Sequence, residues 1–162
     1  MGVLENKIKW IQFQINRNSL FTNYKVNKFS AHVSPYCSFC TNNGEERHFE
    51  TVSHLFYDCH VVQKFWKNLR EWLLILETPI LFPHSKKAVL FGFNDQPYDS
   101  ILNFIILCSK YFIWKSRLQL NPPFFGQLKF FLKSKLNELK GALNWMDKEF
   151  EFEKWNCVLN LL

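Results

Sequence analysis

Residues 37–59 read CSFCTNNGEERHFETVSHLFYDC, and this stretch decides the fold. Cys37 and Cys40 form a Cys-x-x-Cys pair, which is followed by His54 and then by Cys59. Two thiolates on a tight turn, an imidazole and a third thiolate make a four-ligand set for tetrahedral zinc. Because four protein ligands leave no open position for water, we predict one structural zinc ion here and not a hydrolytic one.

Other interpretations of these residues stay open. A chance spacing of ordinary buried thiols would leave no metal site, and another histidine could replace His54. His60, which directly follows the last cysteine, is the stronger competitor, while His48 lies in a charged loop; both are expected to face solvent. Cys108 and Cys157 fall outside the module and are interpreted as core or idle thiols.

The second half of the site needs a particular backbone geometry. Thr51 is placed to cap a helix whose first turn contains His54. His54 and Cys59 are five residues apart, about 140° around a regular α-helix, so both reach one metal only if the helix is interrupted. We therefore predict a break near Asp58, with a long helix restarting at about His60.

Apolar residues at helical spacing predict helices on both sides of the module. The leading helix carries a stripe of Leu4, Ile8, Ile11 and Ile15. Three more helices are predicted over 61–76, 101–118 and 128–143, whereas 88–93 is interpreted as a short strand or extended segment and 94–99 as a turn. The predicted fold is mainly α, a helical domain with a small CCHC zinc module and room for one short hairpin or strand.

The predicted organisation has three parts. An N-terminal helical segment covers 1–34, the zinc module covers 35–60, and a helical C-terminal region covers 61–162. The formal net charge is +6, distributed as +4 over 1–36, −2 over 37–78 and +4 over 79–162. A positive field on both flanks attracts polyanions, although such an excess is also common in proteins that bind no nucleic acid.

Several classes of protein are disfavoured by the sequence. No secretory signal is recognised at the N-terminus, which predicts an intracellular protein of the cytoplasm or nucleus. The apolar segment 101–107, which Asn103 interrupts, is too short for a membrane span. We find no phosphate-binding loop, nucleophile elbow or zincin motif, so we expect neither an enzyme nor a small-molecule substrate.

The residues around the metal site resemble a known family. Cys37-Ser-Phe-Cys40, Glu50-Thr-Val-Ser-His54-Leu-Phe-Tyr-Asp-Cys59 and Phe65-Trp66 are similar to the zinc-binding region at the C-terminus of non-LTR (LINE-type) retrotransposon reverse transcriptases. The resemblance extends through Leu20-Phe-Thr-Asn, Leu90-Phe-Gly92, the segment 103–115 and Lys154-Trp155, and so covers nearly the whole chain.

The resemblance implies a non-catalytic region that follows a polymerase and helps it to engage template RNA and target DNA. Two departures matter: His60 stands where the family often has a proline, and no polymerase motif precedes the site. The chain is then a piece or decayed copy of an element, or a host sequence derived from one. A reverse-transcriptase core would be a partner if the two are expressed as one polyprotein.

Two functions follow as hypotheses. In the first, the chain binds RNA, with DNA as a second partner, through a zinc-stapled basic surface on which one or two of Phe39, Tyr36 and Phe49 stack on bases. The residues predicted to contact phosphate are Lys25, Lys28, Arg47, Lys64, Lys67 and Arg70. In the second, the zinc positions a scaffold for protein–protein or intra-polyprotein packing through Trp72, Ile113 and Trp114, with no nucleic-acid binding.

Overall fold

The computed structural model describes residues 6–42, 46–75, 85–92 and 99–145, with side chains for all of these except 42, 99–100 and 139–145. In chain order the elements are α1 (Asn6–Asn16), α2 (Asn23–Asn27), α3 (Ser38–Asn42), the π-helix η1 (His54–Asp58), α4 (His60–Ile75), α5 (Lys86–Phe91), α6 (Asp99–Leu118) and α7 (Phe125–Trp145). Among the described residues, β structure is limited to an isolated antiparallel bridge between Tyr36 and Phe49. The prediction of a mainly α fold is confirmed.

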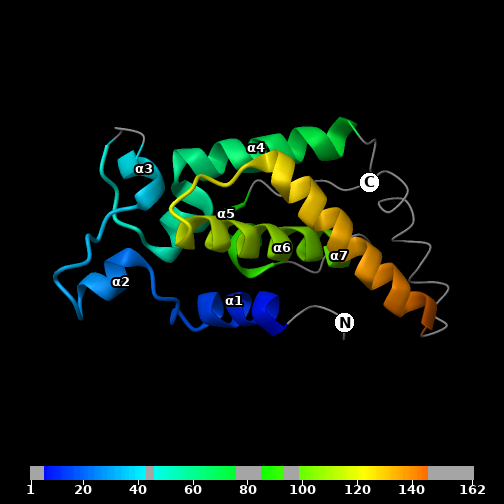
Figure 1. The fold of residues 1–162 in the computed structure, drawn as a ribbon, viewed down its shortest axis with the longest axis horizontal. Coiled ribbons are helices and arrows are strands. Elements are labelled where there is room, and N and C mark those ends of the chain that lie inside the picture. The colour runs from blue at the N-terminus through cyan, green and yellow to red at the C-terminus, as the bar shows by residue number, and fades with distance from the viewer. Residues whose placement is uncertain (1–5, 43–45, 76–84, 93–98, 146–162) are drawn as a thin grey trace.

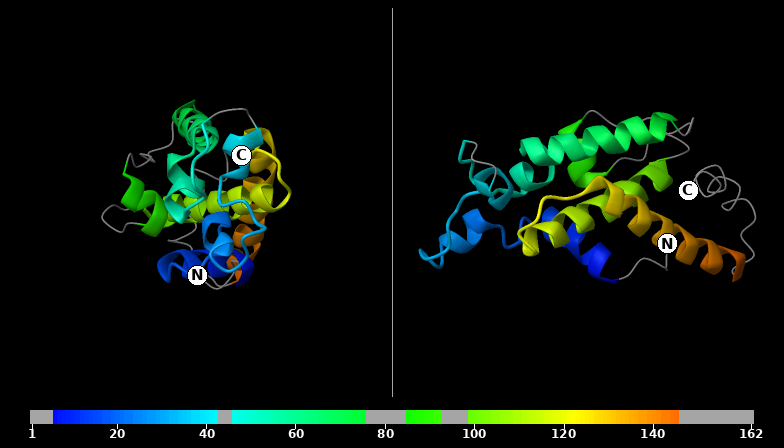
Figure 2. Two further views of the ribbon diagram at one scale, coloured as in Figure 1. Left: turned by 90° about the vertical axis from the view of Figure 1, so that its left-hand side faces the viewer. Right: turned by 45° about the horizontal axis from the view of Figure 1, so that its top comes forward.

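The longer helices form the body of the molecule, and the short helices α2 and α3 lie at one end of it (Figure 1). α1 packs against α6 and α5, while α7 packs against both α6 and α4 (Figure 2). At the end that carries α3, the π-helix η1 contacts α4 and α5. Chain segments from both sides of residues 35–60 therefore meet in one body, with the cysteine-rich stretch at its end.

The predicted apolar stripes form the core of this body. Ile8, Ile11 and Ile15 of α1 are buried, and Leu4 lies outside the described residues. On the later helices the buried stripe residues are Val62, Phe65, Trp66, Leu69 and Leu73 of α4 and Leu128, Leu132 and Leu136 of α7. Of the predicted turn at 94–99, residues 94–98 lie outside the described residues and Asp99 starts α6. Lys154-Trp155 also lies outside them. None of the described helices is long and apolar enough to cross a bilayer.

The expectation of a strand or extended segment at 88–93 is wrong. Lys86–Phe91 forms the helix α5, whose N-cap hydroxyl, Ser85 Oγ, accepts a hydrogen bond from the Ala88 backbone N–H at 3.5 Å. The helix ends at Gly92, which has a φ of 83°, a conformation that glycine adopts without strain. The capping Ser85 and the terminating Gly92 stabilise the two ends of a six-residue helix, which is therefore favoured here over an extended strand.

Candidate metal centre

The structure brings Cys37, Cys40, His54 and Cys59 together in one buried cluster. Their four candidate ligand atoms all lie within 4.8 Å of one another. All three thiols are fully buried, and the imidazole is nearly so. Among the described residues, this is the one group of His, Cys, Asp and Glu side chains with such an arrangement.

The distances within the cluster fit a tetrahedral metal site. Cys59 Sγ lies 3.7 Å from Cys40 Sγ and 4.0 Å from Cys37 Sγ, and His54 Nε2 lies 3.3 Å from Cys40 Sγ. Zinc–sulfur bonds of about 2.3 Å at tetrahedral angles place two sulfurs roughly 3.8 Å apart. The donors are thus already spaced for a metal ion between them, and together they would fill its coordination shell.

The first two cysteines are presented by a short helical turn. Cys37 immediately precedes α3, and Cys40 lies within it. The Cys37 N–H donates to the His48 carbonyl at 2.8 Å, and the Thr41 hydroxyl and N–H donate to the Cys37 carbonyl at 2.9 and 3.0 Å. These bonds fix both ends of the turn, so the two thiols face the interior together.

The π-helix η1 brings the other two candidate ligands, His54 and Cys59, to the same side although they are five residues apart. The Cys59 N–H donates to the His54 carbonyl at 2.9 Å, an i→i+5 bond that places the two residues one turn apart. Cys59 itself is extended, with ψ of 125°, and α4 starts at His60. The predicted break and restart are confirmed. Thr51 is also confirmed as the cap, because its hydroxyl accepts a hydrogen bond from the His54 N–H at 3.1 Å.

An ion pair ties the outer side of this π-helix to α5. Asp58 Oδ2 accepts from Ser53 Oγ at 2.6 Å and from Lys86 Nζ at 2.7 Å. Desolvation alone would raise the pKa of Asp58, but the hydrogen bonds from Lys86 and Ser53 outweigh it and hold the pKa below its ordinary value. The carboxylate is therefore ionised at neutral pH and stabilises the turn that carries the metal ligands.

In the metal-free protein the Cys37 thiol strongly favours its protonated form. A hydrogen bond with Cys59, followed by burial, raises the pKa of Cys37 to about 12. Metals bind thiolates, so loading the site must release the proton that Cys37 holds. Three thiolates and one imidazole form a donor set suited to a soft or borderline metal ion in tetrahedral geometry.

The competing histidines remain outside the cluster. His48 is exposed, as expected, and its ring lies 5.3 Å from that of His54. His60 is only half-exposed, and its Nδ1 atom lies 3.8 Å from Cys40 Sγ. His60 is thus a neighbour of the site, closer to it than a solvent-facing side chain would be. Cys108 is buried within α6, away from the cluster, and Cys157 lies outside the described residues.

A buried carboxylate next to the site connects it to α6. Glu50 is fully buried and accepts hydrogen bonds from the Asn23 N–H at 2.8 Å and from Arg117 Nε at 3.0 Å. Arg117 Nη2 lies 2.9 Å from the same carboxylate oxygen. The sequence placed Arg117 only near the end of the predicted helix 101–118. No local pattern indicates that Glu50 and Arg117, which are 67 positions apart, form a pair.

The six basic residues predicted to contact phosphate fall on two parts of the molecule. Lys28, which directly follows α2, and Arg47, which lies between Cys40 and His54 in the sequence, are exposed. Lys25 of α2 is half-buried and donates to the Asn18 carbonyl. The others are on α4, where Lys64 and Lys67 are exposed, Arg70 is half-buried and Lys67 lies 3.8 Å from Glu71.

One of the three aromatic residues proposed to stack on bases is wrongly assigned. Phe39 is fully buried in the core, because the turn that aims both cysteines inward also turns the residue before Cys40 inward. Tyr36 and Phe49 are accessible and stack on each other, with ring centroids 5.3 Å apart. Tyr24, which sequence inspection did not single out, lies 5.2 Å from Phe49.

Comparison with known proteins gives no relative. No family model, no curated protein and no solved structure matches the chain.

Proposed function

We propose that this chain is the zinc-binding region of a LINE-type retroelement reverse transcriptase, and that it binds RNA, and DNA as a second partner, without catalysing a reaction. The observation that carries the proposal is the buried cluster of Cys37, Cys40, His54 and Cys59. Tetrahedral sites with three thiolates and one imidazole are typical of structural zinc, so zinc is the metal we propose. It stabilises the surface that holds the nucleic acid.

Charge supports nucleic acid as the ligand. The chain carries a net charge of +6, and exposed cations lie directly after α2 (Lys28), within the module (Arg47) and on α4 (Lys64 and Lys67). Glu50, the buried acidic residue among those that the structure describes, is paired with Arg117. Phosphate binding by such a surface releases counterions and therefore weakens as salt concentration rises. In a polyprotein, the adjoining reverse-transcriptase core would be a second partner.

The scaffold hypothesis has less support from the same residues. Ile113 is fully buried and Trp114 nearly so, and Arg117 stacks over the Trp114 ring at 4.9 Å. Trp72 is partly buried and packs edge-on against Phe125, with centroids 6.0 Å apart. These side chains are already used within the chain, so a scaffold would have to present other surfaces.

Fluorescence anisotropy tests the proposal. The zinc-loaded chain is titrated against a structured RNA and a single-stranded DNA at several salt concentrations. We expect binding that weakens steeply with salt and is lost in the Cys37→Ser/Cys40→Ser variant, which cannot hold the module together. Cys108→Ser is the matched control, because it removes a thiol that is equally buried but outside the cluster.

Absence of binding by the folded, zinc-replete chain would refute nucleic-acid recognition. Binding that is insensitive to salt would also count against it, since phosphate contacts are screened and apolar association is not.

A further inference from the structure

Three aromatic rings form a row on the surface beside the metal centre. Tyr36 and Phe49 are parallel, with an interplanar angle of 4° and ring centroids 5.3 Å apart. Tyr24 also contacts Phe49, with the two rings tilted by 47° and their centroids 5.2 Å apart. The central ring is not enclosed, because Phe49 is 52% exposed. We call Tyr24, Phe49 and Tyr36 the aromatic row.

Backbone hydrogen bonds hold the row in place. Tyr36 and Phe49 face each other in the antiparallel bridge, in which the Glu50 N–H donates to the Pro35 carbonyl at 2.9 Å. The Tyr24 N–H donates to the Glu50 carbonyl at 3.4 Å. Three separate segments are thus fastened beside the metal ligands, and the rings are ordered before any ligand arrives.

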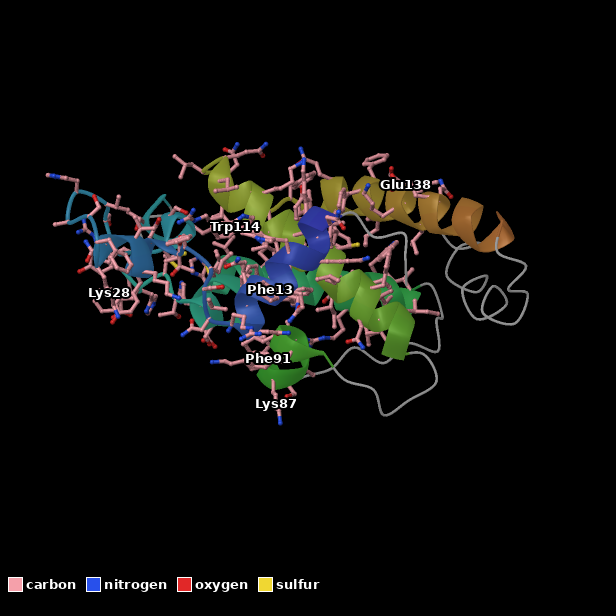
Figure 3. The ribbon with its side chains drawn as sticks, turned by 90° about the horizontal axis from the view of Figure 1, so that it is seen from below. Phe13, Lys28, Lys87, Phe91, Trp114 and Glu138 are labelled. Carbon is pink, nitrogen blue, oxygen red and sulfur yellow. The ribbon has the colours of Figure 1, made fainter. Side chains whose placement is uncertain are left out.

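A cation lies at each end of the row. Lys28 Nζ is 4.6 Å from the centroid of the Tyr24 ring, and Arg47 Cζ is 5.8 Å from that of Tyr36. Both cations are exposed, and Lys28 projects at the end of the molecule that carries α2 (Figure 3). Two acidic residues of the same chain segment have other partners: Glu50 is buried and paired with Arg117, and Glu46 lies 4.0 Å from His48.

We propose that the aromatic row binds single-stranded nucleic acid, RNA and DNA alike, with unpaired bases stacked on its rings and phosphates held by Lys28 and Arg47. The inference rests on the proposed function and narrows it to unpaired strands, held by three rings that include Tyr24 and by two named cations. A duplex hides its base faces within its own stack, whereas a single strand presents both base faces and a phosphate chain. An exposed row of rings with a cation at each end is complementary to that combination.

The two cations have a second role in this arrangement. In the free protein they lie over the rings of Tyr24 and Tyr36 in cation–π contacts. Such contacts are weak at exposed sites, weaker than the stacking of a base on an aromatic ring. A flexible cation that moves to a phosphate therefore frees a ring face for a base. Every base has a face that can stack, so the aromatic row distinguishes single strands from duplexes but does not distinguish one base sequence from another.

The test uses the zinc-loaded full chain and four probes of equal length, about 12 nucleotides, which is within the range of single-strand binding sites. The probes are oligouridine, oligodeoxythymidine, a duplex, and an abasic strand that keeps the phosphates. Phe49→Leu removes the central ring while keeping apolar volume. We expect it to weaken binding of both single strands by about 5- to 150-fold, the usual range for one stacked base.

Phe13→Leu is the matched control. Phe13 is 54% exposed and carries Arg17 over its ring at 5.6 Å, but it lies on α1, away from Lys28 (Figure 3). Its replacement should leave binding unchanged. A second variant, Lys28→Gln/Arg47→Gln, alters only exposed side chains and should reduce the slope of log affinity against log salt by about 1.4, or about 0.7 for each phosphate contact.

The outcomes separate this inference from the proposed function. If Phe49→Leu binds like wild type while Lys64→Gln/Lys67→Gln binds weakly, the aromatic row is overturned and nucleic-acid binding through α4 stands. If the abasic strand or the duplex binds as tightly as the single strands, base stacking is overturned. If the wild type binds none of the probes, both the inference and the proposed function fail.

Discussion

The residue with the most unusual surroundings is Glu50, a carboxylate that is fully buried next to the metal ligands. It accepts hydrogen bonds from Asn23 of α2 and from Arg117 of α6 and precedes the capping residue Thr51. A buried charge is tolerated only when it is paired and hydrogen-bonded. The pair therefore ties the segment that carries the candidate metal ligands to the end of α6.

Breaking this pair should be costly. We expect Arg117→Met to lower the free energy of unfolding by about 3 kcal/mol, because it leaves an uncompensated charge in the interior. Lys86→Met, which breaks the partly exposed pair with Asp58, should cost less than about 1 kcal/mol. Urea denaturation of the zinc-loaded proteins measures both values. Equal losses in the two variants would contradict the structural role of Glu50.

Interactions of this kind could not be read from the sequence. Glu50 and Arg117 are 67 positions apart, and each has an ordinary local context. The burial of Phe39 could not be predicted from the sequence either, because an aromatic residue between two cysteines can be buried in the core or exposed. Which side of the turn faces the body depends on how the helices pack. The ligand set was easier to find, because metal coordination imposes a spacing.

Among the elements, η1 has the most specific task, which is to turn His54 and Cys59 toward one point. Its start depends on Thr51, whose hydroxyl bonds to the His54 N–H. We expect Thr51→Val to lose about 1 kcal/mol of stability, the usual cost of removing a helix cap, and Thr51→Ser to lose much less because it keeps the hydroxyl. Urea denaturation checks this, and equal losses for the two variants would exclude the capping role.

The elements differ in how well periodicity predicts them. α4 and α7 are long enough for an apolar stripe to recur over several turns, so their positions follow from the sequence. Residues 88–93 are too few for that, and a short apolar run fits a strand or a buried helix equally well. The signals that could have identified α5 were at its ends, in Ser85 and Gly92. The break before α4 was predictable because two ligands had to meet.

At the scale of the whole molecule, Lys110 joins three helices in the interior. It lies on α6, is almost fully buried, and donates to the Leu90 carbonyl of α5 at 3.0 Å and to Gln12 Oε1 of α1. Desolvation by burial lowers its pKa from 10.5 to about 7. The charged form is thus disfavoured in the folded protein but not in the unfolded chain.

This shift makes stability depend on pH. Between pH 7 and 10.5 the unfolded chain holds a proton on Lys110 that the folded protein has released, so stability rises with pH in this window. The rise is at most about 1.4 kcal/mol per pH unit and is absent below the window, where both states are protonated. Lys110→Met should remove it. Denaturant titrations of both proteins across the window measure the difference, and identical slopes would contradict the account.

The central claim for the whole molecule is that one metal ion, held by four protein ligands, closes the end of a helical body. Cobalt(II) titration of the metal-free chain tests it most directly, because thiolate ligation and tetrahedral geometry give distinct absorption bands. We predict saturation at one cobalt ion per chain, with thiolate charge-transfer bands that persist in Cys108→Ser and are lost or weakened in Cys59→Ser. A spectrum without thiolate bands, or one unchanged by Cys59→Ser, would contradict the claim.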